Sequence, residues 1–173
     1  MKKFLSIIIP CIILLFSSCG PGDWKVYKAG EFTIEFPGIA KDTATIEGDL
    51  AGVKTYFEPV EGSLDSNLYY AVSFYSLPDS ISILQEDLKD VFTGDVKIYA
   101  YTMNGTLSDS GHVVKSGNYS GMEYKVFLAH SAGTATVRKF AKGKHLYTLL
   151  VVTDQSKIDN TKIERFMESF KLK

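Results

Sequence analysis

The histidines and serines of this 173-residue chain are the residues from which a metal site or a nucleophilic site could be built. Zinc takes several His, Cys or carboxylate ligands, and two ligands on one helix stand three or four residues apart. His112, His130 and His145 have no partner at that spacing, so we expect isolated surface or sheet histidines. Serine hydrolysis needs a positioned base and an orienting acid. Ser110 is close to His112 in sequence only, and no Gly-x-Ser-x-Gly elbow occurs.

The adjacent acids Glu86 and Asp87 do not indicate an acid–base pair. They fall on the polar face of an expected helix, where neighbouring positions point in different directions. A phosphate-binding turn needs glycine between a strand and a helix, but residues 76–79 read Ser-Leu-Pro-Asp. We therefore expect that the protein is not an enzyme and that it binds no cofactor and no metal. A structure that placed a histidine and a carboxylate together in a cleft would reopen the question.

Cys19 is the candidate functional residue that the sequence supports best. The chain begins Met-Lys-Lys, continues with the apolar run 4–16 and reaches Cys19 through two small serines, which is the order of an export signal. The apolar run is too short for a membrane-spanning helix, which needs about 20 residues. The segment resembles a bacterial lipoprotein signal. Ordinary signal-peptide cleavage near Ser18 is the alternative.

The lipoprotein resemblance implies that residues 1–18 are removed and that Cys19 carries lipid. Residues 19–23 (Cys-Gly-Pro-Gly-Asp) then form a short tether, and residues 24–173 form one domain. Cys11 leaves with the signal, so no disulfide is available within the mature chain. The expected location is the bacterial cell envelope, at the periplasmic face or the outer membrane, with the membrane as one partner through the lipid.

The charge of the mature chain argues against nucleic acid as a partner. Removing residues 1–18 lowers the Lys and Arg count from 19 to 17 and leaves 20 acidic residues, a formal net charge of −3. Binding to phosphate backbones needs clustered basic residues. The sequence does not specify the oligomeric state.

Most of the remaining chain predicts strands joined by short turns. In the first strand, Phe32, Ile34 and Phe36 alternate with polar residues, as in a half-buried strand. Residues 39–52 read as a loop or an irregular edge. The expected strands cover residues 32–36, 53–57, 68–76, 112–116, 122–129, 134–141 and 145–153, with a short final strand at residue 172.

Two amphipathic helices interrupt the strands. The first follows a cap at Asp79 or Ser80. It ends near residue 93 with a strand over 96–102, or it continues to about Met103. We favour the longer helix, because Leu84, Val91 and Ile98 recur at intervals of seven. The second begins at residues 159–160 and carries an apolar face. The economical fold is an α+β domain, an antiparallel sheet with helices packed on it.

Several short motifs in this order resemble a known family. They are Gly-Glu-Phe-Thr-Ile-Glu-Phe-Pro-Gly (30–38), the tyrosine-rich strand followed by Leu-Pro (77–78), Gly-Asn-Tyr-Ser-Gly-Met-Glu-Tyr (117–124), Leu-Tyr-Thr-Leu (146–149) and Phe-Met-Glu-Ser-Phe-Lys-Leu (166–172). Residues 24–172 thus resemble the PsbP-like domains of the photosystem II oxygen-evolving complex. The resemblance implies a Mog1/PsbP-like α/β/α sandwich and non-enzymatic work. No functional residue of that family carries over to this chain.

Two functions remain open from the sequence. The first is a membrane-tethered, non-enzymatic lipoprotein that binds an envelope protein or supports an assembly. The second is a small-ligand carrier with a pocket between helix and sheet. Exposed aromatic side chains can anchor a partner, whereas cross-strand pairing is the ordinary role of aromatic residues in a sheet. The tyrosines concerned are Tyr69, Tyr70, Tyr75, Tyr99, Tyr101, Tyr119 and Tyr124.

Overall fold

The computed structural model describes residues 24–46, 51–57, 67–78, 87–108, 110–129, 133–154 and 160–173. Cys19, the expected signal segment 1–18 and the expected tether 19–23 lie outside these residues. The predicted helix cap at residues 79–80 also lies outside them.

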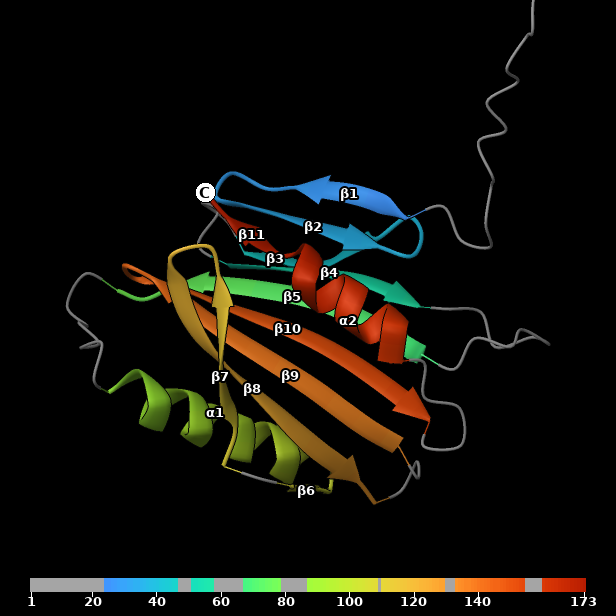
Figure 1. Ribbon diagram of the computed structural model, residues 1–173, viewed down its shortest axis with the longest axis vertical. Coiled ribbons are helices and arrows are strands. Elements are labelled where there is room, and N and C mark those ends of the chain that lie inside the picture. Colours follow the sequence, from blue (N-terminus) through green and yellow to red (C-terminus); the bar gives the residue numbers. More distant parts are fainter. Residues whose placement is uncertain are drawn as a thin grey trace, which may run out of the picture.

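The described residues form strands and two helices, named in chain order (Figure 1). They are β1 (Lys25–Lys28), β2 (Phe32–Phe36), β3 (Lys41–Ile46), β4 (Ala51–Phe57), β5 (Asn67–Ser76), α1 (Leu88–Thr102), β6 (Gly105–Leu107), β7 (His112–Ser116), β8 (Tyr119–Leu128), β9 (Gly133–Lys142), β10 (His145–Asp154), α2 (Asn160–Ser169) and β11 (Lys171–Leu172).

The strands belong to two antiparallel sheets. The larger has the order β3-β4-β5-β10-β9-β8-β6, with β7 also paired to β8, and the smaller has the order β1-β2-β11. The sequence had suggested one sheet. The division follows from Pro37 and Gly38, which end β2, so that β3 begins in the other sheet. Of the two readings of residues 39–52, the irregular edge is correct over 41–46, because β3 is an edge strand whose register shifts between Asp42 and Ala44.

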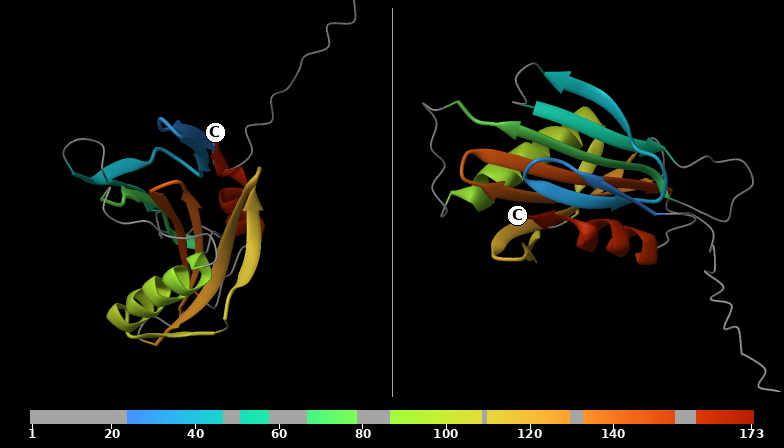
Figure 2. Two further views of the ribbon diagram at one scale, coloured as in Figure 1. Left: turned by 90° about the vertical axis from the view of Figure 1, so that its left-hand side faces the viewer. Right: turned by 90° about the horizontal axis from the view of Figure 1, so that it is seen from above.

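The layers form a sandwich around the larger sheet. Side chains of β10 alternate between its two faces: Leu146 and Leu150 pack with α1, whereas Tyr147 and Leu149 pack with α2 and the smaller sheet. Figure 2 shows α1 and α2 on opposite sides of the larger sheet. The expected α+β fold with helices on both faces is therefore confirmed.

Helix α1 begins at Leu88 in the described residues and confirms the later of the two predicted ends, but not the reason given for it. The helix ends at Thr102, and Asn104 follows with a φ of 49°, the left-handed conformation common after a helix. The buried positions are spaced by four, at Leu88, Phe92, Val96 and Ala100. Ile98, which the interval of seven placed on the buried face, is 65% exposed.

Helix α2 joins the two ends of the described chain. Phe166, Met167 and Phe170 are buried against β2 and the larger sheet. The chain then turns into β11, which pairs with β2, and the Lys173 N–H donates to the Glu31 carbonyl oxygen at 2.9 Å. The smaller sheet is thus built from residues near both ends of the domain (Figure 1).

Candidate ligand-binding site

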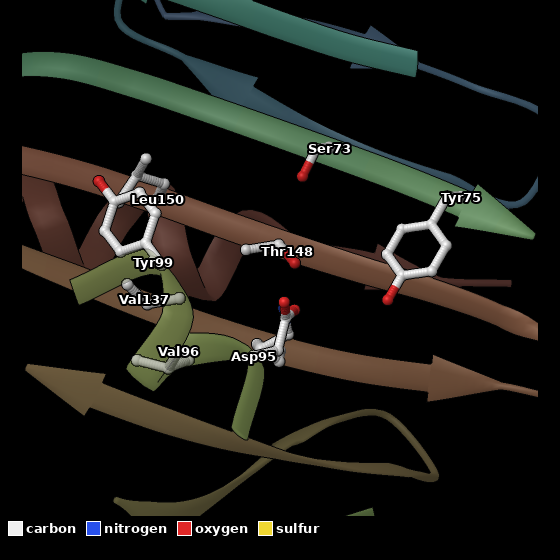
Figure 3. A pocket seen from close by; sticks show the side chains of 9 residues that line it. Ser73, Tyr75, Asp95, Val96, Tyr99, Val137, Thr148 and Leu150 are labelled. Atoms are coloured by element: carbon white, nitrogen blue, oxygen red, sulfur yellow. The ribbon is translucent and has the colours of Figure 1, made fainter. Parts of the chain in front are cut away.

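A cavity of about 210 Å³ lies between α1 and the larger sheet, the position that the ligand-carrier reading required (Figure 3). Strands β5, β10 and β9 form its floor, and α1 forms its roof. Nine residues line it: Ser73, Tyr75, Asp95, Val96, Tyr99, Val137, Lys139, Thr148 and Leu150.

A row of three polar side chains crosses the floor of this cavity. Thr148 on β10 lies opposite Ser73 on β5 and also opposite Lys139 on β9. Directly opposed residues of antiparallel strands point to the same face, and this face is the one that α1 covers. The neighbouring positions along β9 and β10 are apolar, including Val137 and Leu150. The row therefore places two hydroxyls and an ammonium side by side under a helix.

Lys139 is the most unusual member of the row, because it is only 4% exposed. A buried charge needs a partner. Asp95 of α1 accepts a hydrogen bond from the Lys139 ammonium and forms an ion pair with it. The Asp95 side chain is 45% exposed, so this partner faces solvent while the cation does not. An ammonium has three N–H donors, and the hydrogen bonds found among the described residues use one of them.

Two tyrosines complete the walls. In Figure 3 the hydroxyls of Ser73 and Tyr75 and the carboxylate of Asp95 point into the same space, whereas the Tyr99 hydroxyl points away from it. Burial, together with the nearby Tyr69, raises the pKa of Tyr99 to about 12. Burial and the charge of Asp95 also raise the pKa of Tyr75. The Tyr75 hydroxyl keeps its proton at neutral pH and can donate a hydrogen bond into the cavity.

A second buried cation lies on the opposite face of the same sheet. Arg138 Nε donates to Glu123 Oε2 at 2.8 Å, and Nη1 donates to Glu168 Oε1 at 2.8 Å and to the Met167 carbonyl at 3.2 Å. These bonds fasten α2 to the sheet. Arg138 and Lys139 fall within the strand predicted over residues 134–141, and that prediction did not single them out. Two adjacent cations in a sheet covered on both faces were the signal that both would be buried.

The structure does bring a histidine and a carboxylate together. Ser76 Oγ lies 2.6 Å from His145 Nδ1, and His145 Nε2 lies 3.9 Å from Glu31 Oε2. The carboxylate does not orient the imidazole, because 3.9 Å exceeds hydrogen-bond length and Glu31 Oε2 accepts the Tyr147 hydroxyl at 2.6 Å. None of these four residues lines the cavities formed by described residues at α1 or at the smaller sheet. Ser76 and His145 are cross-strand partners of β5 and β10, and the cluster lacks the geometry of a nucleophilic site.

The other sequence candidates are separate from this cluster. Ser110 is exposed, and His112 lies 3.5 Å from Glu123 on the face of Arg138. Within the described ranges, no three His, Cys, Asp or Glu side chains gather as metal ligands would. No helix in that part of the chain is long and apolar enough to cross a membrane.

The fold of this chain is similar to that of solved structures, whereas its sequence has no significant match among family models or curated proteins. The solution structure of cyanobacterial PsbP (CyanoP) from Synechocystis sp. PCC 6803 superposes with a TM-score of 0.58 at 15% identity, over 90% of this chain and 96% of that one.

A second similar structure comes from Bacteroides thetaiotaomicron VPI-5482. It superposes with a TM-score of 0.51 at 12% identity and covers 89% of this chain. This chain spans about half of the Bacteroides protein, 49% of its length. At these identities the likeness concerns the fold, and the fold is PsbP-like, as the motifs had indicated.

Proposed function

We propose that the chain is a non-enzymatic binding lipoprotein that presents α1 to a protein partner of the cell envelope. The observation that carries this proposal is an apolar patch at the end of α1, made of Ile98, Tyr101 and Met103. Ile98 is 65% exposed and Tyr101 is 84% exposed. Positions three apart on a helix are neighbours, so these two side chains form one surface. Contiguous exposed apolar residues mark interaction sites more often than single ones do.

The membrane anchor is the second part of the proposal. Cys19 is lipidated and tethers the domain to a bacterial envelope membrane, by the argument made from residues 1–19. The folded part begins directly after the expected tether: Trp24 packs edge-on against Tyr70, and the Arg165 guanidinium lies 4.4 Å from the Trp24 ring centroid. A tether of a few residues would therefore hold the domain close to the bilayer.

Site-specific photocrosslinking in native membranes tests the binding surface. A photoreactive phenylalanine analogue replaces Tyr101, and the matched control carries it at Lys89, which is exposed near the other end of α1. We expect one discrete crosslinked protein from position 101 that disappears when Ile98→Ser is added. The same products from both positions, or persistence of the product with Ile98→Ser, would contradict an α1 docking surface.

Processing of the precursor tests the anchor. Globomycin should cause an unprocessed form to accumulate, and Cys19→Ala should release the protein from the membrane fraction. Ser18→Ala is the control, because it keeps a small residue before the cysteine. Normal processing and membrane association of Cys19→Ala would overturn the anchor.

The cavity under α1 favours a second candidate function, a small-ligand carrier. Its volume of about 210 Å³ lies below the about 300–1,000 Å³ typical of sites for drug-sized molecules, so the ligand would be small. Native mass spectrometry of protein purified from its own cells tests this function. A bound mass that disappears on denaturation supports it, and a ligand-free protein contradicts it.

A further inference from the structure

Four side chains that can donate hydrogen bonds line the cavity under α1. Lys139 contributes a buried ammonium, and Ser73, Thr148 and Tyr75 contribute hydroxyls. A hydroxyl can also accept, but an ammonium cannot. Among the polar side chains that line the cavity, Asp95 is the one that can only accept, and it already binds Lys139. The polar lining therefore offers an entering group the N–H donors of a buried ammonium that Asp95 does not use and the O–H donors of three hydroxyls.

From this donor set we infer that the cavity binds a small organic carboxylate, with one carboxylate oxygen on the Lys139 ammonium and the other on the hydroxyls of Ser73 and Thr148. The inference rests on the carrier function proposed for this cavity. The register supports the geometry, because Thr148 stands between Ser73 and Lys139 in adjacent strands, about 5 Å apart. A carboxylate lying over Thr148 can reach both neighbours.

The apolar part of the ligand would lie beside the polar row, against the apolar side chains of the cavity. Val137 and Leu150 flank the polar row, and Tyr99 also lines the cavity, with its hydroxyl pointing away from the row (Figure 3). Tyr75 is 37% exposed, and with the half-exposed Asp95 it marks the mouth. A compact ring or branched chain bearing one carboxylate fits a cavity of about 210 Å³.

Asp95 acts as the competing anion when the site is empty. It belongs to α1, whereas Lys139 belongs to the sheet, so the ion pair joins the helix to the sheet beside the cavity. Because a charge-assisted hydrogen bond is stronger than a neutral one, a ligand must match this contact in order to bind. Removing the Asp95 carboxylate should therefore strengthen binding of a carboxylate ligand.

Benzoate is a suitable probe, and benzamide is its neutral control of the same shape. Titration of the isotopically labelled domain, followed by amide chemical shifts, gives both dissociation constants. We expect saturable benzoate shifts centred on β5, β9, β10 and α1, with benzamide at least tenfold weaker. Asp95→Asn should tighten benzoate about tenfold, and Lys139→Met should weaken it at least tenfold. Thr148→Val, which keeps the shape, should weaken it about threefold, as expected for one hydrogen bond.

Equal affinity for benzoate and benzamide would overturn the inference, and so would an unchanged benzoate affinity in Lys139→Met or Asp95→Asn. If Lys139→Met fails to fold, the Asp95→Asn and Thr148→Val comparisons decide the question. Saturable binding of neither probe would also overturn the inference. The benzoate titration tests the cavity alone, so its result does not depend on the result of photocrosslinking at Tyr101. A co-purified neutral ligand in the native mass spectrum would support the carrier function while contradicting the carboxylate.

Discussion

Arg138 and Lys139 are neighbours in β9, yet their side chains enter different layers of the molecule. Arg138 is held by Glu123 and Glu168 on the face of α2, and Lys139 is held by Asp95 on the face of α1. Each helix is thus fixed to the sheet by one buried cation. The two pairs differ in their surroundings, because only the Lys139 pair borders the cavity between α1 and the sheet.

Removing the Arg138 guanidinium should destabilise the domain strongly. Arg138→Met leaves Glu123, whose side chain is 12% exposed, without its cation. Breaking a buried pair from one side costs about 3–5 kcal/mol, and we expect a loss near the lower end in urea unfolding monitored by circular dichroism. The matched control is Glu168→Gln, which removes the partner that is 66% exposed and should cost under about 1 kcal/mol. Equal losses in the two variants would show that burial does not govern this network.

Glu31 links stability to acid pH through Tyr147. The hydrogen bond from the Tyr147 hydroxyl, aided by His145 and Lys142, lowers the pKa of Glu31 below its ordinary value of 4.5 despite some burial. A carboxyl whose pKa is lower in the folded state stabilises the fold above the unfolded-state pKa. That contribution is lost as the pH falls through the folded-state value.

Tyr147→Phe should therefore raise the pKa of Glu31 towards 4.5 and reduce the loss of stability just below that pH. Carboxyl-carbon NMR titration measures the pKa, and urea unfolding between pH 3 and pH 6 measures the stability. Tyr101→Phe, which alters an exposed ring on α1, is the control and should change neither. An unshifted Glu31 in Tyr147→Phe would mean that the cations, not the hydroxyl, hold its charge.

At the scale of elements, α1 combines an inner face that packs on the larger sheet around the cavity with an outer face that nothing in the described chain covers. Gly94 lies on the outer face, and a Cβ placed there would meet no atom within 4 Å. Glycine in a helix costs about 0.5–1 kcal/mol relative to alanine. Among the described residues, no side chain or backbone atom packs against this position.

Gly94→Ala should consequently raise the midpoint of thermal unfolding, with a gain of about 0.5–1 kcal/mol. Gly121→Ala is its counterpart, because a Cβ on Gly121 would lie 2.3 Å from the Lys139 carbonyl oxygen and 2.5 Å from the Phe140 ring. That variant should lower the midpoint by several degrees. Calorimetry of both variants measures the midpoint of thermal unfolding. A Gly94→Ala protein that is less stable than the parent would reveal a contact on this face.

The elements show which features a sequence pattern can predict. Strand β2 followed from residues that repeat locally, namely Phe32, Ile34 and Phe36. The burial of Lys139 did not follow, because its depth depends on α1 lying over β9. The exposure of Ile98 was missed for a related reason: the sheet selects one stripe of α1, and two apolar stripes were available. Tertiary packing decides such choices, and local periodicity does not.

At the scale of the molecule, two cores share one sheet. One core lies under α1, and the other lies under α2 and the smaller sheet. The division into two sheets was not evident from sequence. Strand β11 has only two residues, and it is recognisable as a strand only because it pairs with β2. The cavity lies in the core opposite α2.

Deleting residues 171–173 should open the smaller sheet and leave the larger one formed. The deletion removes the pairing of Lys171 and Leu172 with β2 and the bond from Lys173 to Glu31. These few backbone hydrogen bonds, at about 0.5–1.5 kcal/mol each, predict a loss of about 2 kcal/mol. Hydrogen exchange should accelerate for β2 amides and not for β9 amides. The control Lys171→Ala, at an exposed position, should leave both rates unchanged.

The pairing of β2 with β11 also sets an order of events for the folding chain. During synthesis from the N-terminus, β2 is made early and can pair with β1 at once. Its other edge has no partner until α2 and β11 have been made. An open strand edge invites pairing with another chain. Until α2 and β11 are made, that edge of β2 therefore stays uncovered, and β11, which directly follows α2, is the strand that covers it.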